Sequence, residues 1–182
     1  RPGIDRRIAS DLAGFYLAAR LIEAVAPRVR RLRPVAVVDT LARSLTLEMD
    51  LRLEAAALSE MAQNTANDDD FRVPTVDWRR TSRSVLTMEW IDGIKLSDVA
   101  AIRAAGHDLP KLAATLLQSF LRHALRDGFF HADMHQGNLF VDASGRIVAV
   151  DFGIVGRLGP RERRYLAEIL HGFITRNYRR VA

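Results

Sequence analysis

Apolar residues recur at three- and four-residue steps in two long segments near the start of the chain. In residues 8–33 this spacing predicts a helix that Pro27 and Pro34 break into a loop. Pro34 suits the first position of a second helix, predicted to run unbroken over residues 35–64. The apolar ridges of the two segments consist of Leu12, Phe15, Ala18, Leu21, Ile22 and Val25, and then of Val38, Leu41, Leu45, Leu51, Ala55 and Leu58.

Short strand-like runs and further helices follow the turn-rich tract at residues 64–70, whose aspartates we interpret as a solvated loop. Runs rich in β-formers predict a strand pair, closed by a turn at Asp92–Gly93. The order of elements indicates an α+β, helix-rich fold. The predicted strands are 72–76, 84–91, 139–141 and 146–150, and the later helices are 96–105, 110–127 and 160–178.

Composition excludes several classes of protein and of site. The 182 residues are 48% hydrophobic and 27% charged, which is enough apolar mass for an ordinary folded domain. Because the chain has no cysteine, it has neither disulfides, nor thiolate metal sites, nor a cysteine nucleophile. The longest uncharged stretch, residues 112–121, is about half the ~20 residues that a membrane-spanning helix needs.

The charge balance is basic, with 27 Lys and Arg against 22 Asp and Glu, or +5. Only Lys95 and Lys111 are lysines, and the arginines are scattered in twos and threes without interleaved aromatic residues. This pattern is typical of a solvated surface and argues against nucleic acid as a partner. The best functional use of the positive excess is contact with a membrane surface.

Two motifs in the second half of the chain carry chemistry. The first is a loop from His131 to Asn138 that contains Asp133, and the second is Asp151-Phe152-Gly153 directly after an apolar strand. Phosphoryl transfer needs positioned charge and Mg²⁺, which prefers carboxylate and amide oxygens together with phosphates. Asn138 and Asp151 would supply those oxygens, and Asp133 would be free to orient or deprotonate the attacking hydroxyl or water.

The joint order of these motifs follows the kinase catalytic pattern H-x-D-x-x-x-x-N and then D-F-G. In detail the chain resembles the UbiB-type atypical kinases, the coenzyme Q kinase-like family. The resemblance implies an ATP- or ADP-binding fold that uses Mg²⁺ and supports ubiquinone biosynthesis at the cytoplasmic face of the bacterial inner membrane. It also implies quinone-biosynthesis proteins and a quinone-like lipid as partners. The stretches that carry it are residues 1–4, 48–56, 85–93, 131–138 and 151–153.

The resemblance also implies a role for individual residues. Asp133 resembles the catalytic aspartate, and Asn138 and Asp151 resemble the two metal ligands. Glu54 resembles the helix glutamate that pairs with the nucleotide-binding lysine. The remaining matches are Glu48 and Asp50, similar to the regulatory E-x-D pair that engages an N-terminal K-x-G-Q segment, and Met88, Glu89, Trp90 and Ile91, similar to the hinge that holds adenine.

Helix geometry agrees with only part of this assignment. On an unbroken helix Asp50 and Glu54 lie one turn apart and share a face, whereas Glu48 points elsewhere and serves a different partner. The alternative for these carboxylates is an ordinary charged helix face with Arg43 and Arg52 as neighbours.

The departures from ordinary protein kinases bear on the substrate. Ala132 replaces the arginine that reads a phosphorylated activation segment, and no A-P-E motif follows Gly153. Protein phosphorylation is therefore disfavoured, and ATP hydrolysis or a small-molecule acceptor is favoured. Because the nucleotide-binding lysine would lie before Arg1, we expect a truncated N-lobe over residues 1–91, most of a helical C-lobe over 92–182, and weak MgATP binding without turnover by this chain alone.

Three alternatives stay open. His131, Asp133 and His135 are spaced like ligands of a metal-dependent hydrolase. The second alternative is a non-catalytic, kinase-shaped scaffold of a biosynthetic complex. The third is a small-molecule kinase of the aminoglycoside or choline type, which the E-x-D pair disfavours. In the kinase interpretation His131 braces the loop against Phe152, His135 lines the site, and His123 belongs to the core or surface.

Overall fold

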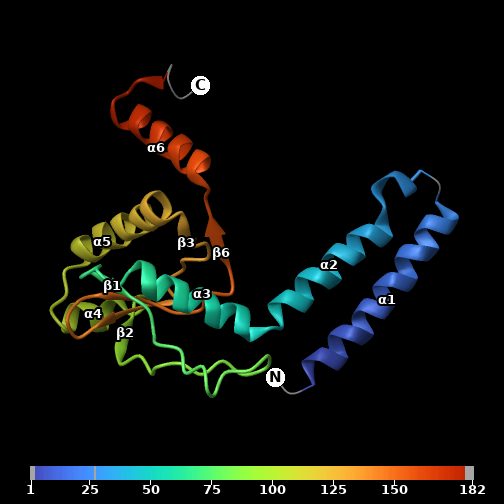
Figure 1. The fold of residues 1–182 in the computed structure, drawn as a ribbon, viewed down its shortest axis with the longest axis horizontal. Coiled ribbons are helices and arrows are strands. Elements are labelled where there is room, and N and C mark those ends of the chain that lie inside the picture. Colours follow the sequence, from blue (N-terminus) through green and yellow to red (C-terminus); the bar gives the residue numbers. More distant parts are fainter. Residues whose placement is uncertain (1–2, 27, 179–182) are drawn as a thin grey trace.

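A helical hairpin projects from a body of short strands and helices in the computed structural model, which describes residues 3–26 and 28–178 (Figure 1). Helices α1 (Ile4–Val25) and α2 (Pro34–Glu48) form the hairpin, and the short helix η1 (Arg30–Leu32) lies in the turn between them. The predicted break at Pro27, the first two residues of the 1–4 stretch, and the end of the C-lobe at 179–182 lie outside the described residues.

Polar contacts between the two helices hold the hairpin together. The Tyr16 hydroxyl on α1 donates a hydrogen bond to Asp39 Oδ1 on α2 at 2.7 Å. Glu23, near the end of α1, accepts a hydrogen bond from the Val35 amide at 3.1 Å and so caps a free N–H at the start of α2. Pro34 stands in the first turn of α2, as predicted, because its missing N–H costs nothing there.

The prediction of one unbroken helix over residues 35–64 is wrong. Helix α2 ends at Glu48, and α3 (Leu51–Asn64) begins after a bend (Figure 1). Asp50 lies outside helical geometry and caps α3, because its carboxylate accepts a hydrogen bond from the Arg52 amide at 3.2 Å. The Leu51 amide donates to the Arg83 carbonyl at 3.0 Å, a tertiary bond that an unbroken helix would not leave free.

The strands form one sheet of four and one of two. In the first, the order is β1-β5-β4-β2, with β1 parallel to β5 and the other pairs antiparallel. In the second, β3 and β6 are antiparallel. The strands are β1 (Phe71–Arg72), β2 (Gly93–Lys95), β3 (Phe129–His131), β4 (Leu139–Asp142), β5 (Ile147–Ala149) and β6 (Val155–Arg157).

The strand predictions are confirmed at the β4–β5 hairpin and only in part before it, where β1 overlaps the predicted strand 72–76 at Arg72. Residues 84–91 form only isolated bridges, between Val76 and Met88 and between Ser82 and Val85, in place of a strand. Gly93, predicted in a turn, is instead the first residue of β2. A Cβ at this position would lie 2.9 Å from the Val141 carbonyl oxygen. Glycine at this position therefore permits close approach of two strands.

The core lies between α3, the four-stranded sheet and the helices that follow β2. Those helices are α4 (Val99–Ala104) and α5 (Leu109–Arg122), and α5 continues into the π-helical turn η2 (His123–Asp127). Helix α6 (Pro160–Ile174) is shorter than the predicted 160–178. No helix in residues 3–26 and 28–178 has the length and apolar character of a membrane span. The buried core side chains are Ala57, Leu58, Met61, Phe71, Val73, Ile102, Leu112, Phe129, Leu139, Val141, Ile147, Ala149 and Phe152.

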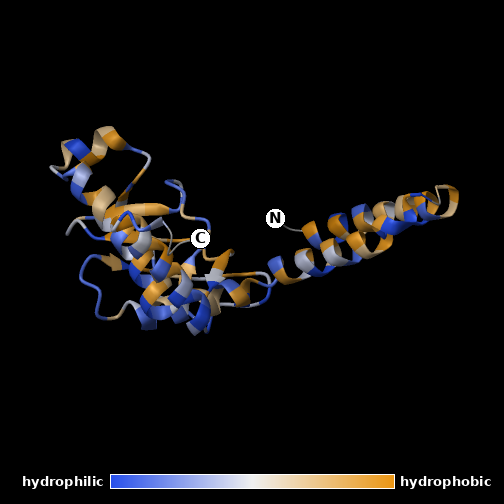
Figure 2. Cartoon of the chain, turned by 90° about the horizontal axis from the view of Figure 1, so that it is seen from above, coloured by the Kyte–Doolittle hydropathy of each residue, from blue (hydrophilic) through white to orange (hydrophobic). Residues whose placement is uncertain are grey.

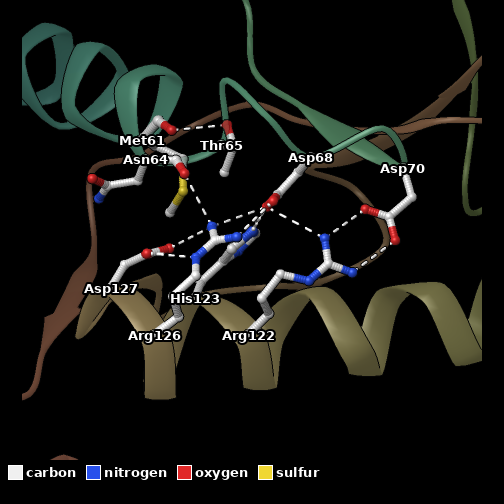
Figure 3. A network of polar contacts seen from close by, with 9 residues as sticks. All are labelled: Met61, Asn64, Thr65, Asp68, Asp70, Arg122, His123, Arg126 and Asp127. Carbon is white, nitrogen blue, oxygen red and sulfur yellow. Dashed lines mark hydrogen bonds and ion pairs between the residues drawn. The ribbon is translucent and has the colours of Figure 1, made fainter.

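Two of the three aspartates after α3, Asp68 and Asp70, are held in ion pairs, contrary to the sequence-based interpretation of a solvated loop, whereas Asp69 is exposed. The Asp68 side chain is only 4% exposed and accepts hydrogen bonds from Arg126 Nη1 at 2.7 Å and His123 Nε2 at 3.2 Å (Figure 3). Asp70 receives two hydrogen bonds from Arg122, at 2.8 and 2.9 Å. The loop folds over the end of α5, where these cations lie one helical turn apart, and His123 is a core residue as expected.

Candidate functional site

His131 joins the two motif segments that the sequence singled out. Its Nδ1 accepts a hydrogen bond from the Asp133 amide at 3.1 Å, and its Nε2 donates to the Val150 carbonyl at 3.3 Å. The ring packs on Phe152 with centroids 4.7 Å apart, which confirms the predicted brace. Because Nδ1 accepts the Asp133 amide, the proton of the ring lies on Nε2, and burial lowers the pKa of His131.

Backbone pairing holds the same two segments in register. The Ala132 amide donates to the Ile154 carbonyl at 3.1 Å, next to the β3–β6 pair. At the other end of the loop, the Val150 amide donates to the Asn138 carbonyl at 2.9 Å. The loop that carries Asp133 is therefore tied on both sides to the segment that carries Asp151.

A cavity of about 440 Å³ opens between these segments and the bend from α2 to α3. We call it the carboxylate cavity, because five of its nine lining residues are acidic and none is basic. It brings together Glu48, Asp50, Glu54, Asp133 and Asp151, five of the ten residues that the sequence proposed for a site. The other lining residues are Leu47, Leu53, Gly153 and Ile154.

Glu54 faces Asp151 across this cavity. It lies in the first turn of α3 and is partly buried. Burial raises the pKa of Glu54, the negative charge of Asp151 raises it further, and the Phe152 backbone acts in the opposite direction. Two carboxylates in this position favour a cation between or beside them.

Asp50 and Glu48 reach the cavity in a way that helix geometry did not predict. Asp50 is the cap of α3 and forms a bidentate ion pair with Arg52, at 2.9 and 2.6 Å. Hydrogen bonding from that guanidinium lowers the pKa of Asp50 to about 2, so the carboxylate stays ionised. Glu48 lines the same cavity as Glu54, whereas an unbroken helix would have turned it away; the bend is the physical reason for this correction.

Asp151 and Asn138 are neighbours through the β4–β5 pairing. The register that pairs Leu139 with Ala149 continues to place Asn138 opposite Val150, beside Asp151. Asp151 has a left-handed backbone, with φ of 63°, which is unusual for a residue with a side chain. Asn138 is 8% exposed, and its Nδ2 is buried without a hydrogen-bond partner among the described residues.

This pair fits the role of a partial Mg²⁺ site. The Asn138 Nδ2 is a hydrogen-bond donor, so it calls for an acceptor such as a water or a phosphate oxygen, and only the amide oxygen of Asn138 could ligate Mg²⁺. Within residues 3–26 and 28–178 no three His, Cys, Asp or Glu side chains are grouped to hold a metal on their own. Mg²⁺ takes one or two protein carboxylates and completes its shell with phosphates and water, so an amide and a carboxylate are a suitable protein contribution.

The histidines do not form the three-ligand site that the hydrolase alternative needs. Both ring nitrogens of His131 are engaged by backbone groups. His135 Nε2 lies 3.7 Å from Asp133 Oδ2, and both side chains are more than half exposed. His135 therefore lies beside Asp133, and His131 serves the backbone.

The four hinge-like residues do not line the carboxylate cavity. The Glu89 side chain pairs with Arg72 at 2.9 Å and accepts the Thr75 amide at 3.2 Å, and its own amide donates to the Thr75 carbonyl at 2.8 Å. Met88 packs against the core, and Trp90 is 88% exposed. Ile91 is partly buried beside them.

Sequence reasoning missed the apolar wall of the cavity. Leu47, Leu53 and Ile154 line it and are each more than half exposed. The sequence did carry a signal for this wall: Leu47 and Leu53 stand on either side of the acidic residues Glu48 and Asp50, and a fully solvated helix face would not need leucines there.

Comparison with known proteins places these residues in a family context. The family model described as the ABC1 atypical kinase-like domain matches residues 1–182. A protein named "Probable protein kinase UbiB" from Marinobacter nauticus is 44% identical over 186 residues, which cover 100% of this chain and 34% of the relative. "Uncharacterized protein Rv0647c" from Mycobacterium tuberculosis is 42% identical over 179 residues, covering 97% of this chain and 36% of the relative.

A solved structure supports the same assignment. It is titled "The complex structure of Rv3197-erythromycin from Mycobacterium tuberculosis" and matches with a TM-score of 0.73 and 26% identity, covering 99% of this chain and 44% of that chain. The kinase-like α+β fold expected from the sequence is therefore confirmed. The chain spans about a third of the length of the curated relatives that it matches.

Proposed function

Because the chain belongs to the ABC1 atypical kinase-like domain family, we propose that its carboxylate cavity is part of the nucleotide site of a phosphotransferase or ATPase. The observation that carries the proposal is the cavity itself, where Asp133 and Asp151 from the two motif segments meet Glu54 from α3. These residues come from three separate parts of the sequence, and their meeting at one place supports a common task.

Asp133 is the residue we assign to the attacking group. Its carboxylate is about half exposed, so a hydroxyl or a water can approach it, and its backbone is held by His131. A carboxylate in this position orients the nucleophile and accepts its proton as the new bond to phosphorus forms. His135, 3.7 Å away, adds a polar group on the open side.

We assign the metal to Asn138 and Asp151. When bound there, Mg²⁺ would supply positive charge that neutralises the phosphates of ATP or ADP. The chain's contribution is to hold an amide beside a carboxylate through the β4–β5 hairpin and to keep Asn138 shielded from water.

Glu54 is assigned to a cation of the nucleotide site. Neither Lys95 nor Lys111 lines the carboxylate cavity. The curated relatives are much longer than this chain, and we assign the partner lysine to a segment that they contain. Glu48 and Asp50, on the same rim, are assigned to the regulatory contact implied by the E-x-D pair.

The remaining assignments rest on family membership. Met88, Glu89, Trp90 and Ile91 form the hinge that holds adenine through backbone groups, with the lobe boundary between Ile91 and Asp92. The UbiB name of the relatives supports a role in the ubiquinone pathway. We further propose quinone-biosynthesis proteins and a quinone-like lipid as partners, and a location at the cytoplasmic face of the bacterial inner membrane. A small-molecule acceptor or water is favoured over a protein.

Single-turnover ATP hydrolysis by the full-length protein tests the proposal. We expect Asp133→Asn and Asp151→Asn each to lower the rate at least about 100-fold, with Asp133→Asn retaining nucleotide affinity and Asp151→Asn losing Mg²⁺-dependent binding. If the protein is a non-catalytic scaffold, the unmutated full-length protein should show no ATP turnover and Asp133→Asn should have no effect. Equal rates in the parent and both variants would overturn the assignment.

A further inference from the structure

The ring of His135 is held in one place although it lies at the surface of the loop. Its Nδ1 accepts a hydrogen bond from the Gly137 amide at 3.1 Å, while the side chain is 56% exposed. A Cβ on Gly137 would lie 2.9 Å from both Nδ1 and Cε1 of the ring, which is closer than a side chain tolerates. The ring can therefore occupy this place only beside a glycine.

The same hydrogen bond fixes the tautomer of His135. A neutral imidazole carries one ring proton, so a ring whose Nδ1 accepts a hydrogen bond carries that proton on Nε2. Nε2 lies 3.7 Å from Asp133 Oδ2, so the donor of the ring is on the side of this carboxylate. The distance is too long for a hydrogen bond, but contacts of catalytic groups are often long before substrate binds and shorten in the complex.

His131 has the same local contact with a different outcome. Its Nδ1 likewise accepts the amide two residues ahead, that of Asp133, and its Nε2 donates to the Val150 carbonyl. His131 is 2% exposed, so its contacts serve the fold. His135 is exposed, and within the described part of the chain its Nε2 meets no backbone group. Holding an exposed ring in this way adds little to stability and indicates a role at the site.

The Asp133 carboxylate has no other group to orient it. Within residues 3–26 and 28–178 neither of its oxygens accepts a hydrogen bond, and its one ion-pair contact is His135. The other polar side chains that line the carboxylate cavity are acidic and repel it. The α1–α2 hairpin points away from the body (Figure 2), and of its described residues only Leu47 and Glu48 line this cavity. The donor available to Asp133 is therefore the Nε2–H of His135.

We propose that His135 is a positioning residue, which turns the Asp133 carboxylate toward the attacking group through its Nε2–H. The role rests on the proposed function, because it matters only if Asp133 acts on a nucleophile. The ring holds one carboxylate oxygen and leaves the other for the hydroxyl or water, as a third group orients a catalytic base. Gly137 belongs to the same arrangement, because it leaves room for the ring and supplies the amide that fixes the proton.

The tautomer is tested without nucleotide. Nitrogen-15 spectra of the histidine rings of the full chain, assigned with His135→Gln, should place the His135 proton on Nε2 at a pH of about 8, where a free imidazole is neutral. In Gly137→Ala the ring should return toward the mixture of tautomers of a free imidazole. A proton on Nδ1 in the unmutated chain, or an unchanged spectrum in Gly137→Ala, would overturn the proposal.

Replacing the ring tests its role in the full-length protein. We expect His135→Ala and His135→Phe each to lower the single-turnover rate of ATP hydrolysis by about ten- to 100-fold, while the affinity for a non-hydrolysable ATP analogue with Mg²⁺ stays within about twofold. His135→Gln keeps an N–H donor at a similar reach and should recover most of the rate, which a purely structural role would not explain. His171→Ala, at an exposed position of α6, is the matched control and should keep the unmutated rate. An unmutated rate in His135→Phe, or a His135→Gln rate as low as that of His135→Phe, would contradict the role.

A double-mutant cycle tests the part assigned to Gly137. Gly137→Ala alone should lower the rate by a factor similar to that of His135→Ala, because the new Cβ displaces the ring. Added to His135→Ala it should cost nothing further, because no ring is left to displace. A further loss in that background would show that Gly137 acts on the loop directly and would refute its link to His135.

The proposed function and the role of His135 fail in different ways. If the unmutated full-length protein shows no turnover, or if Asp133→Asn has no effect, the proposed function fails and the role of His135 fails with it. If Asp133→Asn is inactive while His135→Ala keeps the full rate, the proposed function stands and only the role of His135 fails.

Discussion

His131 and Phe152 pack with their ring centroids 4.7 Å apart and thereby join the loop that carries Asp133 to the segment that carries Asp151. The same imidazole accepts a hydrogen bond from the Asp133 amide and donates one to the Val150 carbonyl, and these bonds reinforce the contact. The two carboxylates assigned to chemistry are thus positioned by a buried ring that touches neither the nucleotide nor the metal in the proposed mechanism. Replacing this ring should therefore change the stability of the fold first and the activity only as a consequence.

Replacing His131 by alanine should lower the free energy of unfolding by about 2–4 kcal/mol, because it empties a buried site and leaves the Val150 carbonyl and Asp133 amide without partners. His135→Ala is the matched control, expected to cost less than about 1 kcal/mol because that ring is more than half exposed. Urea denaturation followed by circular dichroism measures both. Similar costs for the two variants would show that His131 is not the brace described above.

Stability should fall as the pH drops from about 7 to about 5. Burial lowers the pKa of both His123 and His131, so the folded chain stays neutral at these positions while the unfolded chain binds protons below the ordinary histidine pKa of about 6.5. The stabilisation is therefore present above that pH and is lost below it. His123→Gln should flatten the pH dependence of the free energy of unfolding in this range, and an unchanged slope would contradict the prediction.

Asp68→Ala should lower the free energy of unfolding by about 2–3 kcal/mol, because it removes a carboxylate that is only 4% exposed and is the ion-pair partner of the buried His123 as well as of Arg126. Asp69→Ala, at the exposed neighbouring position, should stay within about 0.5 kcal/mol of the parent. Thermal and urea unfolding of the pair measure the difference. A solvated loop would give the same small effect at both positions.

Gly156→Ala should destabilise the fold by about 1–3 kcal/mol, because a Cβ at this position in β6 would overlap the Phe130 ring across the β3–β6 pair. Gly14→Ala should raise stability by about 0.5–1 kcal/mol, since it lies within α1 with no atom near the added Cβ. Opposite signs in urea denaturation are the expected result. A destabilising Gly14→Ala would mean that the α1 surface is less open than described.

Asp151→Gly should raise the free energy of unfolding by about 1 kcal/mol, because glycine adopts the left-handed backbone of this position without strain. The same change should abolish the proposed ATP turnover of the full-length protein. Asp133→Gly, where φ is not positive, should instead lower stability by about 0.5–1 kcal/mol. Loss of stability in Asp151→Gly would show that the carboxylate supports the fold as well as the site.

The parts of the fold that the sequence predicted are those governed by local pattern. The β4–β5 hairpin follows from two apolar runs around a turn with Gly145 in the left-handed region, and α5 follows from its amphipathic spacing and Pro110. The strands β3 and β6 were missed because each has three residues, too few to show an alternation. Their existence depends on pairing with each other.

The placement of the candidate site residues was predicted where they belong to one motif and was mispredicted where tertiary contacts decide. The His131 brace follows from the motif spacing. The apolar ridge continues from Leu45 to Leu51 across the bend, so periodicity concealed the break that brings Glu48 into the carboxylate cavity. The bond from Leu51 to the Arg83 carbonyl, which helps to open the helix there, joins segments that no local pattern relates.

The capping role of Asp50 complicates any mutational experiment on the E-x-D pair, Glu48 and Asp50. Asp50→Ala removes a carboxylate from the cavity rim and, in the same step, the hydrogen bond that starts α3 and the partner of Arg52. A loss of activity in this variant could then come either from the missing partner contact or from the weakened start of α3. Asp50→Asn keeps an acceptor for the Arg52 amide while removing the charge, and Arg52→Ala loosens the carboxylate without deleting it. Only the three variants together disentangle what this position does for the helix from what it does for a partner.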